Sequence, residues 1–411
     1  MSKLDMGTYM VTNKISNLAK TDVSEDDERS MILKTLNDEN LLWPFSKRLL
    51  TFYNGVRNTK FTDPLKATKD FQTCAKKEQI KLDAKTINAK TFKNWLTGKT
   101  VPDHGPENRD RMFAVAFVLG LKKGQVDDLF EKVCFEMSFN VRDSHEYIYM
   151  YCFDKGLKFS DAERLIGQLT SEDETEKPTD QTIPSNVLTT KKFADESELL
   201  NSMKELRHNF SMRNVAAKKK RQDLLNELTG NNSHDGLALI EALLFRGQYS
   251  AKGKEKFLED YKGHDTSSIA FVMDIIKGVN YAGSKGKEET KLLRNLFKQP
   301  ELRAQFPDEA SVRDSNPTVY ALRRDIIFLY FYSFWAKALK EERKYDGDSY
   351  GEFRANIDPV LESCGLPKLY AKNPFDCLFL YCTHRNDKGF QPLEIFRSII
   401  APDDSDEDEE W

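Results

Sequence analysis

The sequence predicts an all-α protein. Glycine and proline number only 20 and 14 among 411 residues, a composition that favours long helices over the many turns of a β-fold. Apolar residues recur at spacings of three and four over most of the chain, which is the period of an amphipathic helix. Aromatic residues make up 11% of the sequence, so we expect packed cores and not a disordered chain.

Composition divides the chain into five segments. Residues 1–30, which include an acidic stretch, are predicted to form a flexible arm. Residues 31–169 are predicted to form a helical N-terminal lobe. The segment 170–192 is acidic and rich in Ser, Thr and Pro, so we expect it to be a linker without a core of its own. Residues 193–402 are predicted to form a larger helical C-terminal lobe, followed by an acidic tail at 403–411.

A short segment, residues 90–102, has the residue pattern of a helix that contacts DNA. Its apolar residues fall on one helical face and would anchor it to a scaffold; they are Phe92, Trp95 and Leu96. The opposite face carries side chains that can reach phosphates and base edges, namely Lys90, Thr91, Lys93 and Asn94. Gly98 suits the left-handed position that ends a helix, and Pro102 prevents its continuation.

The residues that follow complete a recognisable pattern. The string TFKNWLTGKTVP is followed by FAVAFVLGL at 113–121 and VDDLF at 126–130. Together they resemble the second half of a Cro/C1-type (XRE-like) helix-turn-helix domain, over about residues 76–133. In that family a recognition helix ends in W-L-x-G and precedes a proline, an apolar helix and a final short helix. The segment 79–87 would take the place of the family's second helix, with Lys85 and Thr86 at positions that are apolar and glycine in the family.

The resemblance implies a set of contacts and partners. Base edges would be contacted by Lys90, Thr91, Lys93 and Asn94, and phosphates by Lys85 and Lys99. The partner would be double-stranded DNA, and proteins with this domain usually bind it as homodimers. The domain implies neither a metal nor another cofactor, and the family is prokaryotic.

The distribution of charge favours a nucleic-acid partner. The formal net charge is −4, but the tail alone carries seven carboxylates, so the rest of the chain has a net charge of +3. Residues 60–102 hold ten lysines and four acids, which would attract phosphates. A second basic patch is predicted at Arg213, Lys218, Lys219, Lys220 and Arg221. For both clusters the alternative is a solvated, lysine-rich surface without a ligand.

Motifs for metal binding and catalysis are absent from the sequence. The six cysteines form no C-x-x-C pair, and the grouping of Cys364, Cys377, Cys382 and His384 matches no zinc spacing. The segment 283–288 lacks the first glycine and the Ser or Thr of a phosphate-binding loop, and no H-E-x-x-H or G-x-S-x-G occurs. Residues 1–20 contain no apolar signal segment, and the longest apolar run, 326–336, is too short to span a bilayer. We therefore expect a cytoplasmic, non-enzymatic protein with free thiols and without a metal, cofactor or membrane anchor.

Some aromatic helices resemble one another. Asn316-Pro317 and Asn373-Pro374 each precede an apolar helix that contains Phe-Leu-Tyr, and residues 145–153 have a similar aromatic, cysteine-containing composition. A duplicated helical unit would explain this likeness. Chance is the simpler explanation at the level of sequence, because buried helices share composition.

Two functional hypotheses follow, and an enzyme with an unrecognised site in the C-terminal lobe is a third alternative. The first is a non-enzymatic DNA-binding protein, either a transcriptional regulator or a factor linked to a phage or mobile element. The second is a helical protein-interaction or sensor module, such as a phage-defence component, in which the helix-turn-helix is vestigial. The second hypothesis explains why some 200 residues follow the linker, and it predicts a protein partner for the C-terminal lobe.

Overall fold

The structure, a computed structural model, describes most of the predicted N-terminal lobe and about half of the predicted C-terminal lobe. The described residues are 25–83, 86–102, 105–170, 185–206, 214–229, 314, 317–341, 349–384 and 392–400. Over these residues it contains helices and no strand, which confirms the predicted all-α class. The predictions for most of the flexible arm, for the acidic stretch 171–184, for the acidic tail, and for Lys85 and Arg213 lie outside the described residues.

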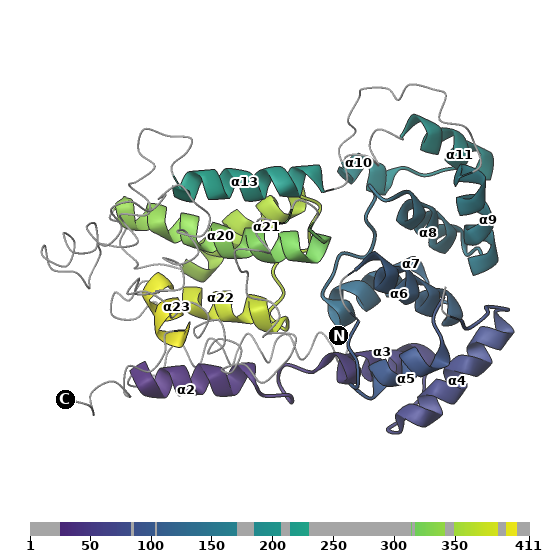
Figure 1. Ribbon diagram of the computed structural model, residues 1–411, viewed down its shortest axis with the longest axis horizontal. Helices are drawn as coiled ribbons and strands as arrows, with labels where there is room; N and C mark the ends of the chain where they lie inside the picture. The colour runs from purple at the N-terminus through teal and green to yellow at the C-terminus, as the bar shows by residue number, and fades with distance from the viewer. Residues whose placement is uncertain are drawn as a thin grey trace, which may run out of the picture. The chain divides into compact units, whose positions relative to one another are not determined.

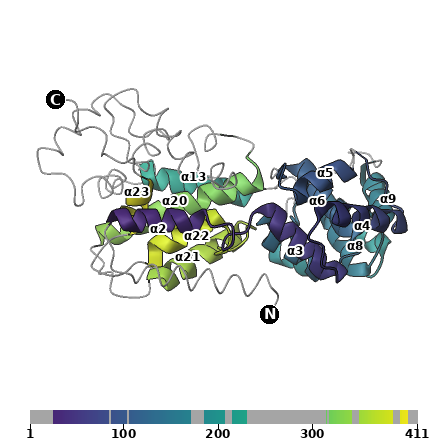
Figure 2. The same ribbon diagram turned by 90° about the horizontal axis from the view of Figure 1, so that it is seen from below.

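The described residues pack as two compact units, shown in Figure 1 and, after a quarter turn, in Figure 2. We name them by their helices. The α3–α11 unit contains the described residues of 44–216 and 364–367. The α20–α23 unit contains those of 1–43, 217–363 and 368–411.

The α3–α11 unit is a succession of short helices. They are α3 (Phe45–Arg57), α4 (Pro64–Lys77), α5 (Ala89–Leu96), α6 (Pro106–Val118), α7 (Lys123–Asp128), the π-helical segment η1 (Leu129–Cys134), α8 (Ser144–Lys155), α9 (Phe159–Thr170), α10 (Ser185–Thr190) and α11 (Glu196–Glu205). The helix α6 is at the centre, because nearly all its residues from Met112 to Val118 are buried. Its aromatic rings contact α8, with the rings of Phe117 and Phe153 stacked at a centroid distance of 4.1 Å. This aromatic packing forms the core that supports α3, α4 and α5.

The α20–α23 unit has a separate core of aromatic rings. Its helices are α2 (Glu25–Leu36), α13 (Val215–Thr229), α20 (Val319–Lys340), α21 (Ser349–Ser363), α22 (Pro374–His384) and α23 (Pro392–Ile400). Phe331 of α20 contacts Phe379 of α22 and Phe396 of α23, at centroid distances of 5.0 and 5.7 Å. The helix α2 packs on α22 and α23 and lies beside them in both views (Figures 1 and 2).

The boundaries of the units differ from those expected from composition. Residues 25–30, expected in the flexible arm, begin α2, which is held in the α20–α23 unit by the buried side chains of Ile32 and Leu36. The second half of the expected linker forms α10, whose Leu188 is buried. Phe193, expected at the start of the C-terminal lobe, packs on Tyr147 in the α3–α11 unit. A few apolar anchors in polar segments thus determine where these segments pack.

The described helices include none that is long and apolar enough to cross a bilayer. The longest, α20, has 22 residues, but it carries buried arginines and an aspartate near its start.

Candidate nucleic-acid interface

The helix predicted to contact DNA is formed by local signals at both ends. Asn88 caps its start, and the Asn88 side chain accepts a hydrogen bond from the Thr91 backbone N–H at 2.8 Å. This bond satisfies one of the donors that a helix leaves free in its first turn. At the other end Gly98 has φ +68°, the left-handed conformation that ends a helix at little cost only in glycine. The predicted helix is confirmed as α5.

The apolar face of α5 is anchored as its spacing predicts. Phe92, Trp95 and Leu96 are all buried. The ring of Phe92 stacks on Phe71 of α4 at a centroid distance of 3.9 Å, and Trp95 meets Phe45 of α3 edge to face at 6.2 Å. Because two neighbouring helices hold it, α5 presents its other face in a fixed orientation.

The other face of α5 carries the predicted contact residues at the surface. Lys90 and Lys93 are exposed, whereas Thr91 and Asn94 are half-buried at the edge of the helix. Lys99 follows Gly98 and is also exposed. The structure therefore brings these five predicted residues onto one short helix and its C-terminal turn.

The connection that precedes α5 differs from a short turn. It runs from Glu78 to Asn88, and its described residues are not helical, so α4 is the helix that precedes α5. Thr86 is buried there, and its hydroxyl donates to the Lys81 carbonyl at 2.6 Å. A helix-turn-helix usually has a turn of three or four residues. The predicted DNA contact therefore depends on the exposed side chains of α5 and not on the connection that precedes it.

Basic side chains surround α5 on the neighbouring elements. Nine of the ten lysines of residues 60–102 are described, and all nine are exposed. Of these nine lysines, only Lys81 forms an ion pair within the described residues, with Asp83 at 3.3 Å. The other eight have no ion-pair partner in the described part of the chain; they are Lys60, Lys66, Lys69, Lys76, Lys77, Lys90, Lys93 and Lys99.

The acids of the same segment are mostly engaged in local structure. Asp70 accepts hydrogen bonds from Arg57 at 3.0 Å and from the Tyr53 hydroxyl at 2.6 Å. The hydrogen bond from Arg57 and that from Tyr53 hold the pKa of Asp70 below its usual range, although burial opposes them. Asp63 caps α4 by accepting from the Leu65 backbone N–H. The lysines are therefore left with little compensating negative charge, which favours binding of an anion.

The second predicted basic patch is only partly exposed. On α13, Lys219 is exposed, and Lys218 and Lys220 are half-buried, with the Lys220 ammonium over the Tyr330 ring. Arg221 is buried and pairs with Asp325 of α20 at 3.2 Å. Because its guanidinium is used inside the core, Arg221 is unsuited to contact a nucleic acid.

The cysteines are mostly structural thiols. Five of the six are buried, and burial raises the pKa of Cys377 to about 12, so its thiol stays protonated and unreactive at neutral pH. The described residues contain no group of three or more His, Cys, Asp or Glu side chains that could hold a metal ion.

The sequence prediction did not include Asn88, although it orients the start of the contact helix. A signal was available, because an asparagine directly before a helical apolar pattern is a typical N-cap. The role of Arg57 was also missed, since its partner Asp70 is on the next helix.

No family model matches the chain, and neither a curated protein nor a solved structure shows significant similarity to it.

Proposed function

We propose that the chain is a non-enzymatic DNA-binding protein that contacts double-stranded DNA through α5. It would act in the cytoplasm as a transcriptional regulator or as a factor linked to a phage or mobile element. The observation that carries the proposal is the two-sided character of α5. Its apolar face is buried on α3 and α4, and Lys90 and Lys93 on its other face are exposed without ion-pair partners among the described residues.

The residue types on this face suit both parts of DNA recognition. Lysine neutralises phosphates and can also donate to guanine, whereas Asn94 could pair with adenine through its amide. Thr91 could contact the methyl group of thymine or a phosphate. Lys99 would anchor the backbone beside the end of the helix, and Lys85 would do the same before it. The remaining lysines would supply the salt-dependent share of the binding free energy.

A sequencing-based selection tests the proposal directly. The full-length protein is incubated with a randomised duplex pool at about 150 mM salt, where long-range attraction is largely screened, and the retained duplexes are sequenced. We expect an enriched motif, palindromic if the protein binds as a homodimer. Retention without an enriched motif would contradict sequence-specific regulation.

A matched pair of variants assigns the contact to α5. Lys93→Ala with Asn94→Ala should weaken binding to the selected motif by about 1–3 kcal/mol per lost base contact. The control, Lys158→Ala with Lys192→Ala, removes two exposed lysines elsewhere in the α3–α11 unit. Equal binding by the two double variants would show that α5 is not the contact helix.

The second candidate function is a protein-interaction or sensor module with a vestigial helix-turn-helix. Two observations favour it. The connection from Glu78 to Asn88 is longer than the usual turn, and the α20–α23 unit has an aromatic core independent of α5. In this case the protein would elute from heparin at low salt, and variants of α5 would not change its interactions.

A further inference from the structure

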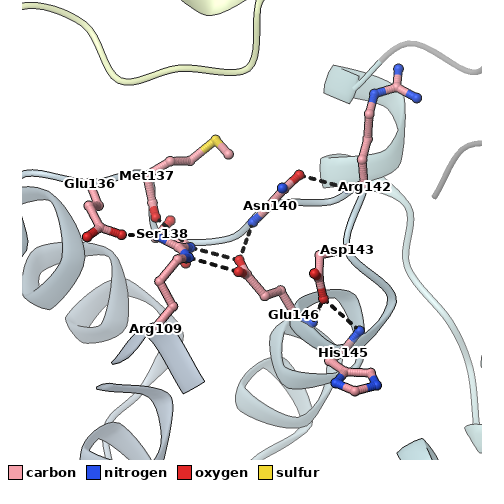
Figure 3. Close-up of polar contacts among 9 residues, drawn as sticks. All are labelled: Arg109, Glu136, Met137, Ser138, Asn140, Arg142, Asp143, His145 and Glu146. Carbon is pink, nitrogen blue, oxygen red and sulfur yellow. Dashed lines mark hydrogen bonds and ion pairs between the residues drawn. The ribbon is translucent and has the colours of Figure 1, made fainter. Parts of the chain in front are cut away.

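One buried ion pair holds the loop before α8 in the α3–α11 unit. Arg109 of α6 donates to both carboxylate oxygens of Glu146 on α8, at 2.9 and 2.8 Å (Figure 3). The same guanidinium donates to the carbonyls of Met137 and Ser138, at 3.0 and 3.4 Å. Glu146 also accepts from the Asn140 backbone N–H at 2.7 Å. Arg109 and Glu146 therefore fasten the loop to α6 and to α8.

The α20–α23 unit contains the same arrangement. Arg323 of α20 donates to both carboxylate oxygens of Asp376 on α22, at 2.9 and 2.6 Å. The same guanidinium donates to the Lys368 carbonyl at 2.8 Å, and Asp376 accepts from the Tyr370 backbone N–H at 2.8 Å. These four contacts of Arg323 and Asp376 each have a counterpart around Arg109 and Glu146.

From the loops onward the correspondence keeps one register, whereas the two arginines are 214 positions apart because the chain between arginine and loop is 16 residues longer in the α20–α23 unit. The residue pairs Ser138 and Lys368, Asn140 and Tyr370, and Glu146 and Asp376 are each 230 positions apart. The helix caps keep this spacing, because Asp143 accepts from the N–H two residues onward at 3.0 Å and Asn373 does so at 2.9 Å. The turns before them also agree: Asp143 donates to the Asn140 carbonyl and Asn373 to the Tyr370 carbonyl, both at 2.8 Å.

The preceding helices end in the same way at the same spacing. Phe135 has φ +59° and Gly365 has φ +67°, so each chain turns through the left-handed region three residues before the carbonyl that the arginine binds. The segment before Phe135 is π-helical, and a π-turn accommodates one extra residue in a helix. The helix before Gly365, α21, is an ordinary α-helix.

The aromatic packing continues the match. Phe117 lies eight residues after Arg109 on α6, and Phe331 lies eight residues after Arg323 on α20. Phe117 contacts Tyr149 of α8 at a centroid distance of 5.9 Å, and Phe331 contacts Phe379 of α22 at 5.0 Å. Tyr149 and Phe379 are again 230 positions apart.

We infer that the chain contains two copies of one helical unit, residues 106–170 and 317–400, each fastened by a buried arginine–carboxylate clamp. The copies comprise α6 to α9 and α20 to α23. The segments 138–153 and 368–383 share only two identical residues, Tyr151 with Tyr381 and Cys152 with Cys382, so the relation is carried by the contacts. The two copies have the same arrangement of core rings and connecting loop. The duplication does not depend on the proposed DNA contact of α5.

If this inference is right, the loops held by the two clamps, residues 138–144 and 368–374, can replace one another. In the first chimera, residues 138–144 (SFNVRDS) of the full-length protein are replaced by 368–374 (KLYAKNP). The buried residues Phe139 and Val141 then become Leu and Ala, and the cap Asp143 becomes Asn. The control chimera receives the same length of chain shifted by one residue, 367–373 (PKLYAKN), which puts Lys in the place of Phe139 and moves the cap off Asp143.

Urea unfolding followed by circular dichroism compares the two chimeras. We expect the in-register chimera to unfold cooperatively with a midpoint within roughly 0.5 M of the unmodified protein, and the shifted control to lose at least roughly 1 M. In the reciprocal exchange residues 368–374 are replaced by 138–144. There too the in-register chimera should have a higher unfolding midpoint than a chimera shifted by one residue. Equal midpoints for the in-register and shifted chimeras, whether high or low, would overturn the inference and leave the proposed DNA contact unaffected.

Discussion

The ring of Phe92 on α5 stacks on the ring of Phe71 on α4, with centroids 3.9 Å apart and planes inclined by 19°. Both side chains are fully buried. This contact joins the helix that carries the proposed DNA contacts to the helix before it. It makes the orientation of α5 depend on core packing, so stability and DNA binding can be separated by substitutions on opposite faces of one helix.

Truncation of Phe92 should destabilise the protein strongly. Phe92→Ala removes a fully buried ring and leaves a cavity between α4 and α5, so the free energy of unfolding should fall by about 3–5 kcal/mol. Urea unfolding measures this loss. The control Lys93→Ala, on the exposed face, should change the free energy of unfolding by about 0.5 kcal/mol or less. Comparable losses for the two variants would contradict the assignment of faces.

Gly98 should not tolerate a side chain. Its φ of +68° is unfavourable for alanine, and an added Cβ would lie 3.2 Å from the Ser46 hydroxyl oxygen. We expect Gly98→Ala to lower the free energy of unfolding by about 1 kcal/mol. Gly55 is a matched control, because it lies within α3 with open space around it and a helical backbone. Gly55→Ala should be neutral or stabilising by about 0.5–1 kcal/mol, and a loss there equal to that at Gly98 would refute the conformational argument.

The arginine of each clamp should be needed for stability. Burial by itself would lower the pKa of Arg109, but the carboxylates of Glu146 and Glu136 more than offset this, so the guanidinium stays charged. Arg109→Met leaves Glu146 buried without its partner and should lower the free energy of unfolding by about 3–5 kcal/mol. Arg323→Met should have a similar effect through Asp376.

Two further variants make this prediction specific. Adding Glu146→Met to Arg109→Met should restore part of the loss, because it removes the buried carboxylate that Arg109→Met leaves without its arginine, while the ion pair to Glu136 stays broken. The surface control Arg111→Met breaks an ion pair with Glu107, whose side chain is 76% exposed, and should cost about 1 kcal/mol or less. The clamp would be energetically unimportant if Arg109→Met and Arg111→Met lowered stability equally.

Stability should depend on pH through Asp110. Burial raises the pKa of Asp110 to about 6; His145 opposes the rise, and the carboxylates of Asp143 and Glu146 add to it. The folded state therefore binds a proton more tightly than the unfolded state. The contribution of Asp110 to the free energy of unfolding therefore falls as the pH rises from about 4 to 6, the interval between its pKa values in the unfolded and folded states.

Asp110→Asn should remove this dependence. At pH 7 we expect the variant to be more stable than the unmodified protein by on the order of 1 kcal/mol, allowing for screening by solvent. The difference should disappear at about pH 4, below which Asp110 is protonated in both states. Unfolding curves at pH 4, 5, 6 and 7 measure the difference in free energy of unfolding between the variant and the unmodified protein. A difference that did not change with pH would exclude titration of Asp110 as its cause.

Local patterns in the sequence predicted the class of the fold and the faces of α5. The spacing of Phe92, Trp95 and Leu96 is sufficient to define a buried face, because helical periodicity is a property of neighbouring residues. Gly98 marked the end of the helix for the same reason. The DNA contacts of Lys90 and Lys93 remain a prediction, since exposure permits binding without identifying a ligand.

Tertiary structure decided what composition could not. The acidic segment around Leu188 looks like a linker in sequence, and the stretch around Ile32 looks like the start of the N-terminal lobe. One or two apolar side chains are enough to hold the first in the α3–α11 unit and the second in the α20–α23 unit. Arg221 looks like part of a basic patch, but Asp325 pairs with it from more than 100 positions away.

The sequence alone determined that this protein is helical, where α5 ends, and which side of α5 is apolar, because these properties depend on neighbouring residues. Only the tertiary structure paired Arg109 with Glu146 and Arg323 with Asp376, because the partners lie on different helices. Such pairs leave no periodic signal in the sequence. The 230-residue spacing between the two clamped loops becomes visible only when their contacts are compared.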